Sequence, residues 1–275
     1  MDNSLLRHLT ACNNAELPGS RIAFRHGEQI VGWLTPVVAA ALERLAGVQR
    51  DAQGLALPNP ADLPDLGRQM AGLGFGRVRG EMFDVRANPD GPVLSTIDRG
   101  ALPSFGIAAA GVHLDGLVRR ADGLHLWVAR RAADKALDPN KLDHIVAGGV
   151  PAGYTPWDCL VKEAMEEAAM PAALLANARL CTRISYAMER PEGLRRDILH
   201  CYEVELPDDF IPTPTDGEVA GFELWPISRA LHAVRTTDAF KFNVSVVLIA
   251  LFIRHGLVTG DEAARLSAAL AHDDR

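Results

Sequence analysis

Residues 148–170, GGVPAGYTPWDCLVKEAMEEAAM, join a glycine-rich turn directly to an acidic helix. Thr155 is placed to cap the helix, Pro156 suits its first position, and Pro171 lies just past its end. Glycine lets a backbone approach a ligand, or present carbonyl oxygens to an ion, where a side chain would clash. The segment therefore predicts a helix with defined ends, preceded by a turn that a ligand can approach.

Three glutamates of this helix lie on one face, because Glu163, Glu166 and Glu167 stand at positions i, i+3 and i+4. Like charges at this spacing repel each other and weaken an isolated helix. If the glutamates were considered alone, a helix face exposed to water would explain them. Exposure to water does not explain the glycine turn that precedes the helix. Clustered carboxylates suit Mg²⁺ or Mn²⁺, which bind together with substrate phosphates. The segment therefore predicts a metal site.

This pattern resembles the Nudix box of the Nudix hydrolases, whose consensus is G-x5-E-x7-R-E-U-x-E-E-x-G-U, with U a bulky apolar residue. Gly148 and the three glutamates match it. Four positions depart from the consensus: Tyr154 replaces the loop glutamate, Lys162 the arginine, Ala164 the bulky residue and Ala169 the glycine. Tyr154 cannot act as an anionic ligand at neutral pH, and Lys162 keeps the charge of arginine without its two-pronged geometry.

Other segments extend the resemblance to one branch, the Nudix proteins related to thiamin pyrophosphokinase. These segments are GVHLDGLV, LWVARRAADK, LDHIVAGGVPAG, VKEAMEEAAMP, ELPDDFIPTPTDGEVAGFEL and FKFNVSVVLIALFIRHG. The resemblance implies an α/β (α+β) fold. It places an α/β/α sandwich with a mixed sheet over residues 104–275 and a smaller α+β domain over residues 1–103. It also implies MutT-like, Mg²⁺-dependent hydrolysis of thiamin diphosphate, or of its oxidised or damaged forms, to the monophosphate plus phosphate.

The resemblance also implies roles for particular residues. The metal ions are expected on Glu163, Glu166, Glu167 and the backbone of Gly148, and Lys162 is expected to orient the glutamates. Catalytic roles are expected for Glu166, Glu167 and Glu218, of which Glu218 follows a flexible loop and precedes a strand.

Phosphate needs cations besides metal, and the candidates for substrate binding are Arg130, Arg131, Lys135 and Tyr186. Arg130 and Arg131 are adjacent in a strand, so the period of two sends them to opposite faces and only one is expected to reach the site.

Two other functions stay open. The same metal site serves a Nudix hydrolase of a nucleoside diphosphate derivative of the ADP-ribose, dinucleotide or coenzyme A type. A Nudix-fold binding module without catalysis is the other alternative, although an inactive scaffold has no chemical reason to keep three repelling carboxylates.

The composition limits the partners and the compartment. The chain has 275 residues, enough for two modest domains, and a net charge of -7 without a long run of Lys or Arg, which argues against nucleic acid. Residues 1–10 lack a secretory pattern, and the longest apolar run, residues 246–253, is far short of the roughly 20 residues that cross a bilayer. Four cysteines without C-x-x-C spacing are typical of a reduced protein. We expect a cytoplasmic enzyme acting on a small-molecule diphosphate, with the oligomeric state, a homodimer included, left open.

The remaining elements follow from hydrophobic periodicity and turn residues. We expect a hairpin that turns at His26 and Gly27, helices from Pro36 to about Leu45 and over residues 64–73, and a buried helix over residues 246–253. Strands are expected at residues 144–147, 182–188, 198–205 and 221–225, besides a hairpin pair on either side of residues 121–123.

Overall fold

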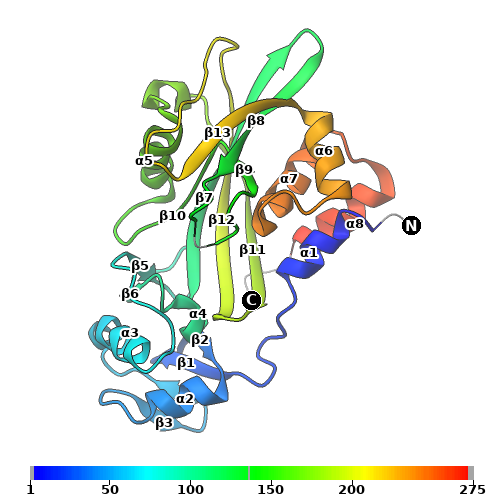
Figure 1. Cartoon of the computed structure of the whole chain (residues 1–275). Helices are drawn as coiled ribbons and strands as arrows, with labels where there is room; N and C mark the ends of the chain where they lie inside the picture. Colours follow the sequence, from blue (N-terminus) through cyan, green and yellow to red (C-terminus); the bar gives the residue numbers. More distant parts are fainter. Residues whose placement is uncertain (1–2, 136, 272–275) are drawn as a thin grey trace.

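The computed structural model describes residues 3–135 and 137–271, and a seven-stranded mixed sheet forms its centre (Figure 1). The strands are β7 (Ala108–Arg120), β8 (Gly123–Arg131), β9 (Leu142–His144), β10 (Val146–Gly149), β11 (Arg179–Arg190), β12 (Gly193–Glu205) and β13 (Val219–Pro226). The order is β11-β12-β7-β8-β13, with β10 paired to β7 and β9 paired to β8. Only β12 and β7 run parallel among these pairs, which makes the sheet mixed.

Helices cover both faces of this sheet (Figure 1). One face packs against α5 (Pro156–Ala168) in a cluster that includes Val112, Leu114 and Leu160. The other face packs against α7 (Phe242–Arg254), with α6 (Ile227–Thr236) and α8 (Gly260–Leu270) beside it. Alternate residues of each strand supply the two faces, so both cores are apolar. The expected α/β/α sandwich with a mixed sheet is confirmed.

The N-terminal part adds a smaller unit with its own apolar cluster. A four-stranded sheet contains β1 (Ile22–His26), β2 (Gln29–Leu34), β3 (Gln49–Asp51) and β4 (Gly54–Ala56). A two-stranded sheet pairs β5 (Met82–Val85) with β6 (Ser95–Asp98). The helices are α2 (Pro36–Leu42), η1 (Pro60–Asp62), α3 (Leu63–Gly72) and α4 (Leu102–Phe105). We call residues 21–105 the accessory unit, and its mixture of helices and strands agrees with the expected α+β domain.

The first helix lies outside this unit. Helix α1 (Leu6–Cys12) buries Leu5, Leu9 and Cys12 in the cluster formed by α7 and α8. The boundary at residue 103 stays a prediction, and the structure adds that residues 5–12 pack with the large sheet.

Most local expectations are confirmed, although the bounds of several elements differ. Helix α7 begins four residues before its expected start, and β12 begins five residues before its expected start. Helix α2 ends at Leu42, three residues before the predicted end. The strand expected at residues 144–147 is two strands, because β9 pairs with β8 whereas β10 pairs with the first half of β7. All four cysteines are free, as expected. Among the described residues no helix combines the length and apolar character needed to span a bilayer.

Candidate metal and phosphate site

The predicted turn and helix form with the expected ends. Thr155 accepts a hydrogen bond from the backbone N–H of Asp158 at 3.1 Å, and the Asp158 carboxylate accepts one from the backbone of Thr155, which completes a capping box. Pro156 is the first helical residue. The thiol of Cys159 donates to the carbonyl of Gly149 at 3.3 Å, so the first turn of α5 packs on β10.

Glycine at position 148 allows a glutamate to lie against the strand. A Cβ atom added to Gly148 would be 2.6 Å from Cγ of Glu163, closer than real Cβ contacts come. Only a residue without a side chain leaves this room. The Gly148 position and Glu163 therefore fit each other directly.

The three glutamates of α5 have different surroundings. The side chains of Glu163 and Glu166 are 16% and 48% exposed, and Glu167 is 7% exposed. Lys162 lies 3.2 Å from the Glu163 carboxylate and 2.5 Å from the Glu166 carboxylate. Burial lowers the pKa of Lys162, but its bonds to these two carboxylates outweigh burial and raise it. The structure thus places Lys162 where it can orient two of the acids.

Glu167 is the buried acid of the site. Its carboxylate accepts a hydrogen bond from the backbone N–H of Ala147 at 2.8 Å. Burial raises the pKa of Glu167 well above its ordinary value, and the neighbouring acids Asp143, Glu163 and Asp216 add to the effect. A bound cation would compensate such a carboxylate.

Two acids of the loop before β13 come close to Glu167. Ligand oxygens of Glu167, Asp216 and Glu218 all lie within 4.8 Å of one another. Glu218 is the residue expected from its position in the sequence. Asp216 was not predicted, although two carboxylates beside the glycine of the TDGE turn were a visible signal. Carboxylate oxygens in this number fit a hard divalent cation.

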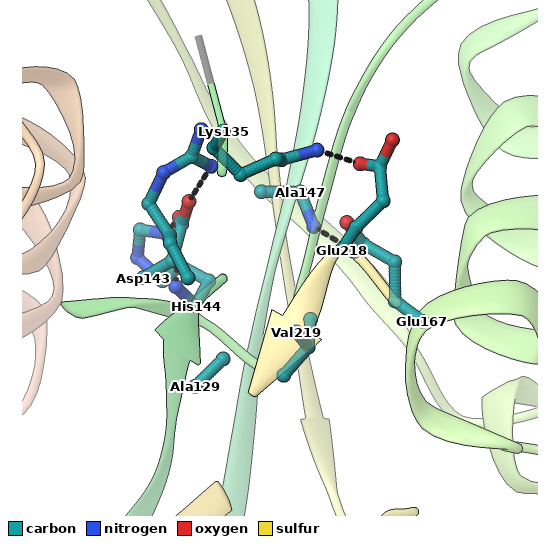
Figure 2. Close-up of a pocket in the computed structure, with 9 residues that line it drawn as sticks. Ala129, Lys135, Asp143, His144, Ala147, Glu167, Glu218 and Val219 are labelled. Carbon is teal, nitrogen blue, oxygen red and sulfur yellow. Dashed lines mark hydrogen bonds and ion pairs between the residues drawn. The ribbon is translucent and has the colours of Figure 1, made fainter. Parts of the chain in front are cut away.

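A small pocket is lined by the acids Glu167 and Glu218 and by a cationic wall, which consists of Arg131 and Lys135 (Figure 2). Its volume is about 10 Å³, and its lining consists of Ala129, Arg131, Lys135, Asp143, His144, Ala147, Glu167, Glu218 and Val219. Figure 2 shows Lys135 reaching toward the Glu218 carboxylate, with which it forms an ion pair. We call this the acidic pocket.

The candidates for substrate binding divide between two places. Arg131 and Lys135 line the acidic pocket, whereas Arg130 binds the Asn140 carbonyl at 3.1 Å and does not line it. The structure thus places Arg131 at the acidic pocket and Arg130 away from it, and a role of either arginine in substrate binding stays a prediction. Tyr186 is also absent from the acidic pocket. Its ring is buried in the cluster around α7, and it lines a second, larger cavity described below.

Buried polar residues support the cationic wall. Asp143 bonds Arg131 at 2.8 Å and lies 3.8 Å from Lys241. Burial raises the pKa of Asp143, but Lys241 and the other cations beside it outweigh burial and hold its pKa at about 2. Nδ1 of His113 lies 2.8 Å from Nδ1 of His144. The group His113, Asp143 and His144 has the spacing of a metal site, but two cations already neutralise its carboxylate. We therefore interpret this group as one that holds Arg131 in position, and not as a second metal site.

Several known proteins are similar to this chain. A family model described as NUDIX domain matches residues 111–244. The chain is 38% identical over 189 residues to Nudix hydrolase 20, chloroplastic, of Arabidopsis thaliana, over 69% of this chain and 50% of the relative. It is 39% identical over 181 residues to Nudix hydrolase 24, chloroplastic, of the same plant, over 66% of this chain and 50% of the relative. The crystal structure of DR0079 from Deinococcus radiodurans matches with a TM-score of 0.48 and 24% identity, over 61% of this chain and 97% of that chain.

The chain spans about half the length of these two curated relatives. The family match covers the turn, the acidic helix and the acids before β13. Residues 111–244 of this chain therefore form a NUDIX domain.

Proposed function

We propose that this chain is a Mg²⁺-dependent pyrophosphohydrolase, which cleaves the diphosphate linkage of a small organic diphosphate. The observation that carries the proposal is the buried carboxylate of Glu167, whose oxygens lie within 4.8 Å of ligand atoms of Asp216 and Glu218. Such a group of acids is unfavourable by itself and becomes favourable beside a divalent cation.

The residues that would hold the cation are Glu163, Glu166 and Glu167, with the backbone of Gly148 beside Glu163 and the Asp216 carboxylate close to Glu167. When bound, Mg²⁺ lowers the pKa of a water ligand and withdraws negative charge from phosphoryl oxygens. Lys162 keeps Glu163 and Glu166 together through its two ion pairs. Mn²⁺ has the same ligand preference and serves as the test ion.

Hydrolysis adds water across the P–O–P bridge, so the attacking water must lose a proton and the departing phosphate must carry negative charge. Glu218 lines the acidic pocket with an exposed carboxylate and is placed to accept this proton. Lys135 and Arg131 line the same pocket and supply positive charge for the phosphate oxygens. Glu167 keeps its position through the Ala147 N–H.

For the substrate we propose thiamin diphosphate, or its oxidised or damaged forms, with thiamin monophosphate and phosphate as the products. This choice is supported by the resemblance of six separate segments to the thiamin pyrophosphokinase-related branch. The acidic pocket would handle the diphosphate of many compounds in the same way, so the choice depends on a direct assay.

The test is a panel of diphosphates incubated with the purified protein and Mg²⁺, with release of phosphate and monophosphate measured. The panel contains thiamin diphosphate, its oxothiamin and oxythiamin forms, ADP-ribose, a dinucleotide and coenzyme A. We expect the fastest release from a thiamin compound and loss of activity in Glu167→Gln. Glu16→Gln, the same change at an exposed position, is the matched control. A clear preference for ADP-ribose over every thiamin compound would refute the proposed substrate. A protein that binds no Mn²⁺ in titration calorimetry and hydrolyses no member of the panel would favour a binding module.

A further inference from the structure

The acidic pocket has no room for the organic part of a substrate. Its volume of about 10 Å³ accommodates one water-sized group. Cavities that hold small organic molecules have volumes of roughly 300–1,000 Å³. The group attached to the diphosphate therefore needs another cavity.

A cavity of that size lies where the accessory unit meets the large sheet. Its volume is about 390 Å³. We call it the junction cavity, and it is lined by residues from three parts of the chain, among them Asp84, Asp90, Ala108, Ala110, Val150 and His200. The accessory unit supplies the two acids, and the strands β7 and β12 supply the alanines and the histidine.

The accessory unit is fixed to the turn that precedes α5. The backbone N–H of Ala152 donates to the carbonyl of Met82 at 2.8 Å, and that of Gly153 donates to the Asp84 carboxylate at 3.3 Å. A Cβ atom on Gly149 would lie 2.6 Å from the Phe83 ring, so this glycine lets strand β5 approach the turn closely. The junction cavity is therefore built by both units together.

The lining favours a ring with hydrogen-bonding edges over a phosphate group. Ala108 and Ala110 give small apolar surfaces on which a planar group can lie. Burial, with a smaller effect of a neighbouring arginine, lowers the pKa of His200, so its ring offers one N–H donor and one nitrogen acceptor. In the part of the chain that the structure describes, residues 3–135 and 137–271, the His200 side chain has no hydrogen-bond partner.

Charge at the cavity also disfavours an anion. Asp84 pairs with Arg86 at 3.1 Å, and Asp90 pairs with Arg183 at 2.6 Å. These two arginines are thus neutralised by carboxylates, and Arg196, which also lines the cavity, donates to the Gly106 carbonyl at 3.3 Å. A phosphate placed here would meet the acids Asp84 and Asp90. A neutral or cationic nitrogen heterocycle meets no such penalty.

The junction cavity and the acidic pocket are neighbours along one strand. Ala147 lines the acidic pocket, and Val150 lines the junction cavity three residues later. Three extended residues span roughly 10 Å. A diphosphate with a short linker covers such a distance.

We propose that the junction cavity binds a planar nitrogen heterocycle, the organic group of the diphosphate substrate, and that the accessory unit thereby selects which diphosphates are hydrolysed. This inference rests on the proposed function of the acidic pocket.

The test measures binding of the ring without its phosphates. Thiamin and adenosine are titrated calorimetrically into the full-length protein without divalent metal, and into Ala110→Phe, which fills the cavity, and His200→Ala. We expect one of the two compounds to bind the wild-type protein, at least 10-fold weaker binding in Ala110→Phe, and about 5-fold weaker binding in His200→Ala, the effect of one lost hydrogen bond. Ala121→Phe, the same enlargement at an exposed turn, should bind like the wild type.

The outcomes separate this inference from the proposed function. Mn²⁺ affinity should stay unchanged in both cavity variants, and KM for the hydrolysed diphosphate should rise with the loss of ring binding. Unchanged ring binding and KM in Ala110→Phe, or no binding of either ring to the wild type, overturns the inference. If circular dichroism shows that Ala110→Phe does not fold, His200→Ala decides. If the wild type binds the ring, the cavity variants do not, and no diphosphate is hydrolysed, the inference stands and the proposed function is wrong.

Discussion

Replacing Glu167 by glutamine should make the metal-free protein more stable and the enzyme slower. Glu167 is 7% exposed and has a single hydrogen bond, from the Ala147 N–H. Glutamine keeps an oxygen for this bond and removes the charge. Since burial raises the pKa of Glu167, the ionised side chain destabilises the folded state at neutral pH. The expected gain in the free energy of unfolding is about 1–3 kcal/mol, the usual cost of burying a polar group with incomplete compensation.

The pH dependence of this gain follows from the direction of the pKa shift. A carboxyl group with a raised folded-state pKa contributes stability below its unfolded pKa and loses it as the pH rises through the folded pKa. The wild-type protein should therefore lose stability relative to Glu167→Gln as the pH rises, and the two should converge near pH 4, where the side chain is protonated in both states. Urea unfolding in EDTA, at several pH values, measures the difference.

The same two proteins should also differ in their stabilisation by Mg²⁺ and in their turnover rate. At a Mg²⁺ concentration of 100 times Kd, the wild type should gain about 2.7 kcal/mol, and the variant should gain much less. The variant should turn over roughly 100-fold more slowly, which corresponds to the loss of about 3 kcal/mol of transition-state stabilisation. In Glu166→Gln, at a side chain 48% exposed, metal-free stability should change by less than about 0.5 kcal/mol. A Glu167→Gln protein that works at the wild-type rate in saturating Mg²⁺, or that is less stable without metal, would refute the reasoning.

Three further changes test the surroundings of the acids. Gly148→Ala places a Cβ atom 2.6 Å from Cγ of Glu163, so the glutamate must move, and kcat should fall roughly 100-fold. Gly221→Ala, where the added Cβ atom meets open space, should leave kcat unchanged. Equal rates of the two variants in initial-velocity assays would contradict the fit between Gly148 and Glu163. Lys162→Ala should lower kcat about 10-fold, as loss of an orienting partner does, and Lys162→Arg should restore it; an unrestored rate would count against an orienting role. Asp143→Asn leaves two buried cations unpaired and should cost about 3–5 kcal/mol at pH 7. Because the pKa of Asp143 is depressed to about 2, its stabilising effect is present above its ordinary pKa of 3.8 and is lost as the pH falls toward 2. The urea midpoints of the wild type and Asp143→Asn should therefore approach each other in that pH range. A constant difference between the two midpoints across the range would argue against the pKa shift.

The parts of the site that the sequence predicted correctly are those encoded by local signals. Thr155, Pro156 and the spacing of the glutamates act within one helix, so their pattern is enough to predict the helix and its acidic face. The pattern does not distinguish the buried Glu167 from the exposed Glu166. That difference arises because β10 packs on one side of α5, and the side is set by the pairing of β10 with β7.

The parts that escaped prediction depend on contacts between distant residues. His113 and His144 are 31 positions apart and meet only because β10 and β9 follow each other beside β7. The division of one expected strand into β9 and β10 has the same origin, since the two pieces look continuous in the sequence. The junction cavity requires the docking of the accessory unit on the turn before α5, which no single segment encodes. The metal ligands and the substrate-binding roles themselves stay predictions until the assays above are done.

The position of α1 has a practical consequence for anyone who wishes to separate the two units. Cutting the chain at residue 104 removes Leu5 and Leu9 from the core beside α7 and α8. Two buried leucines contribute roughly 3–6 kcal/mol, which is a large part of the stability of a typical domain. The truncated protein would also expose an apolar patch and tend to aggregate. A soluble minimal NUDIX domain would have to retain the first helix, joined ahead of β7 through a linker long enough to reach its site between α7 and α8.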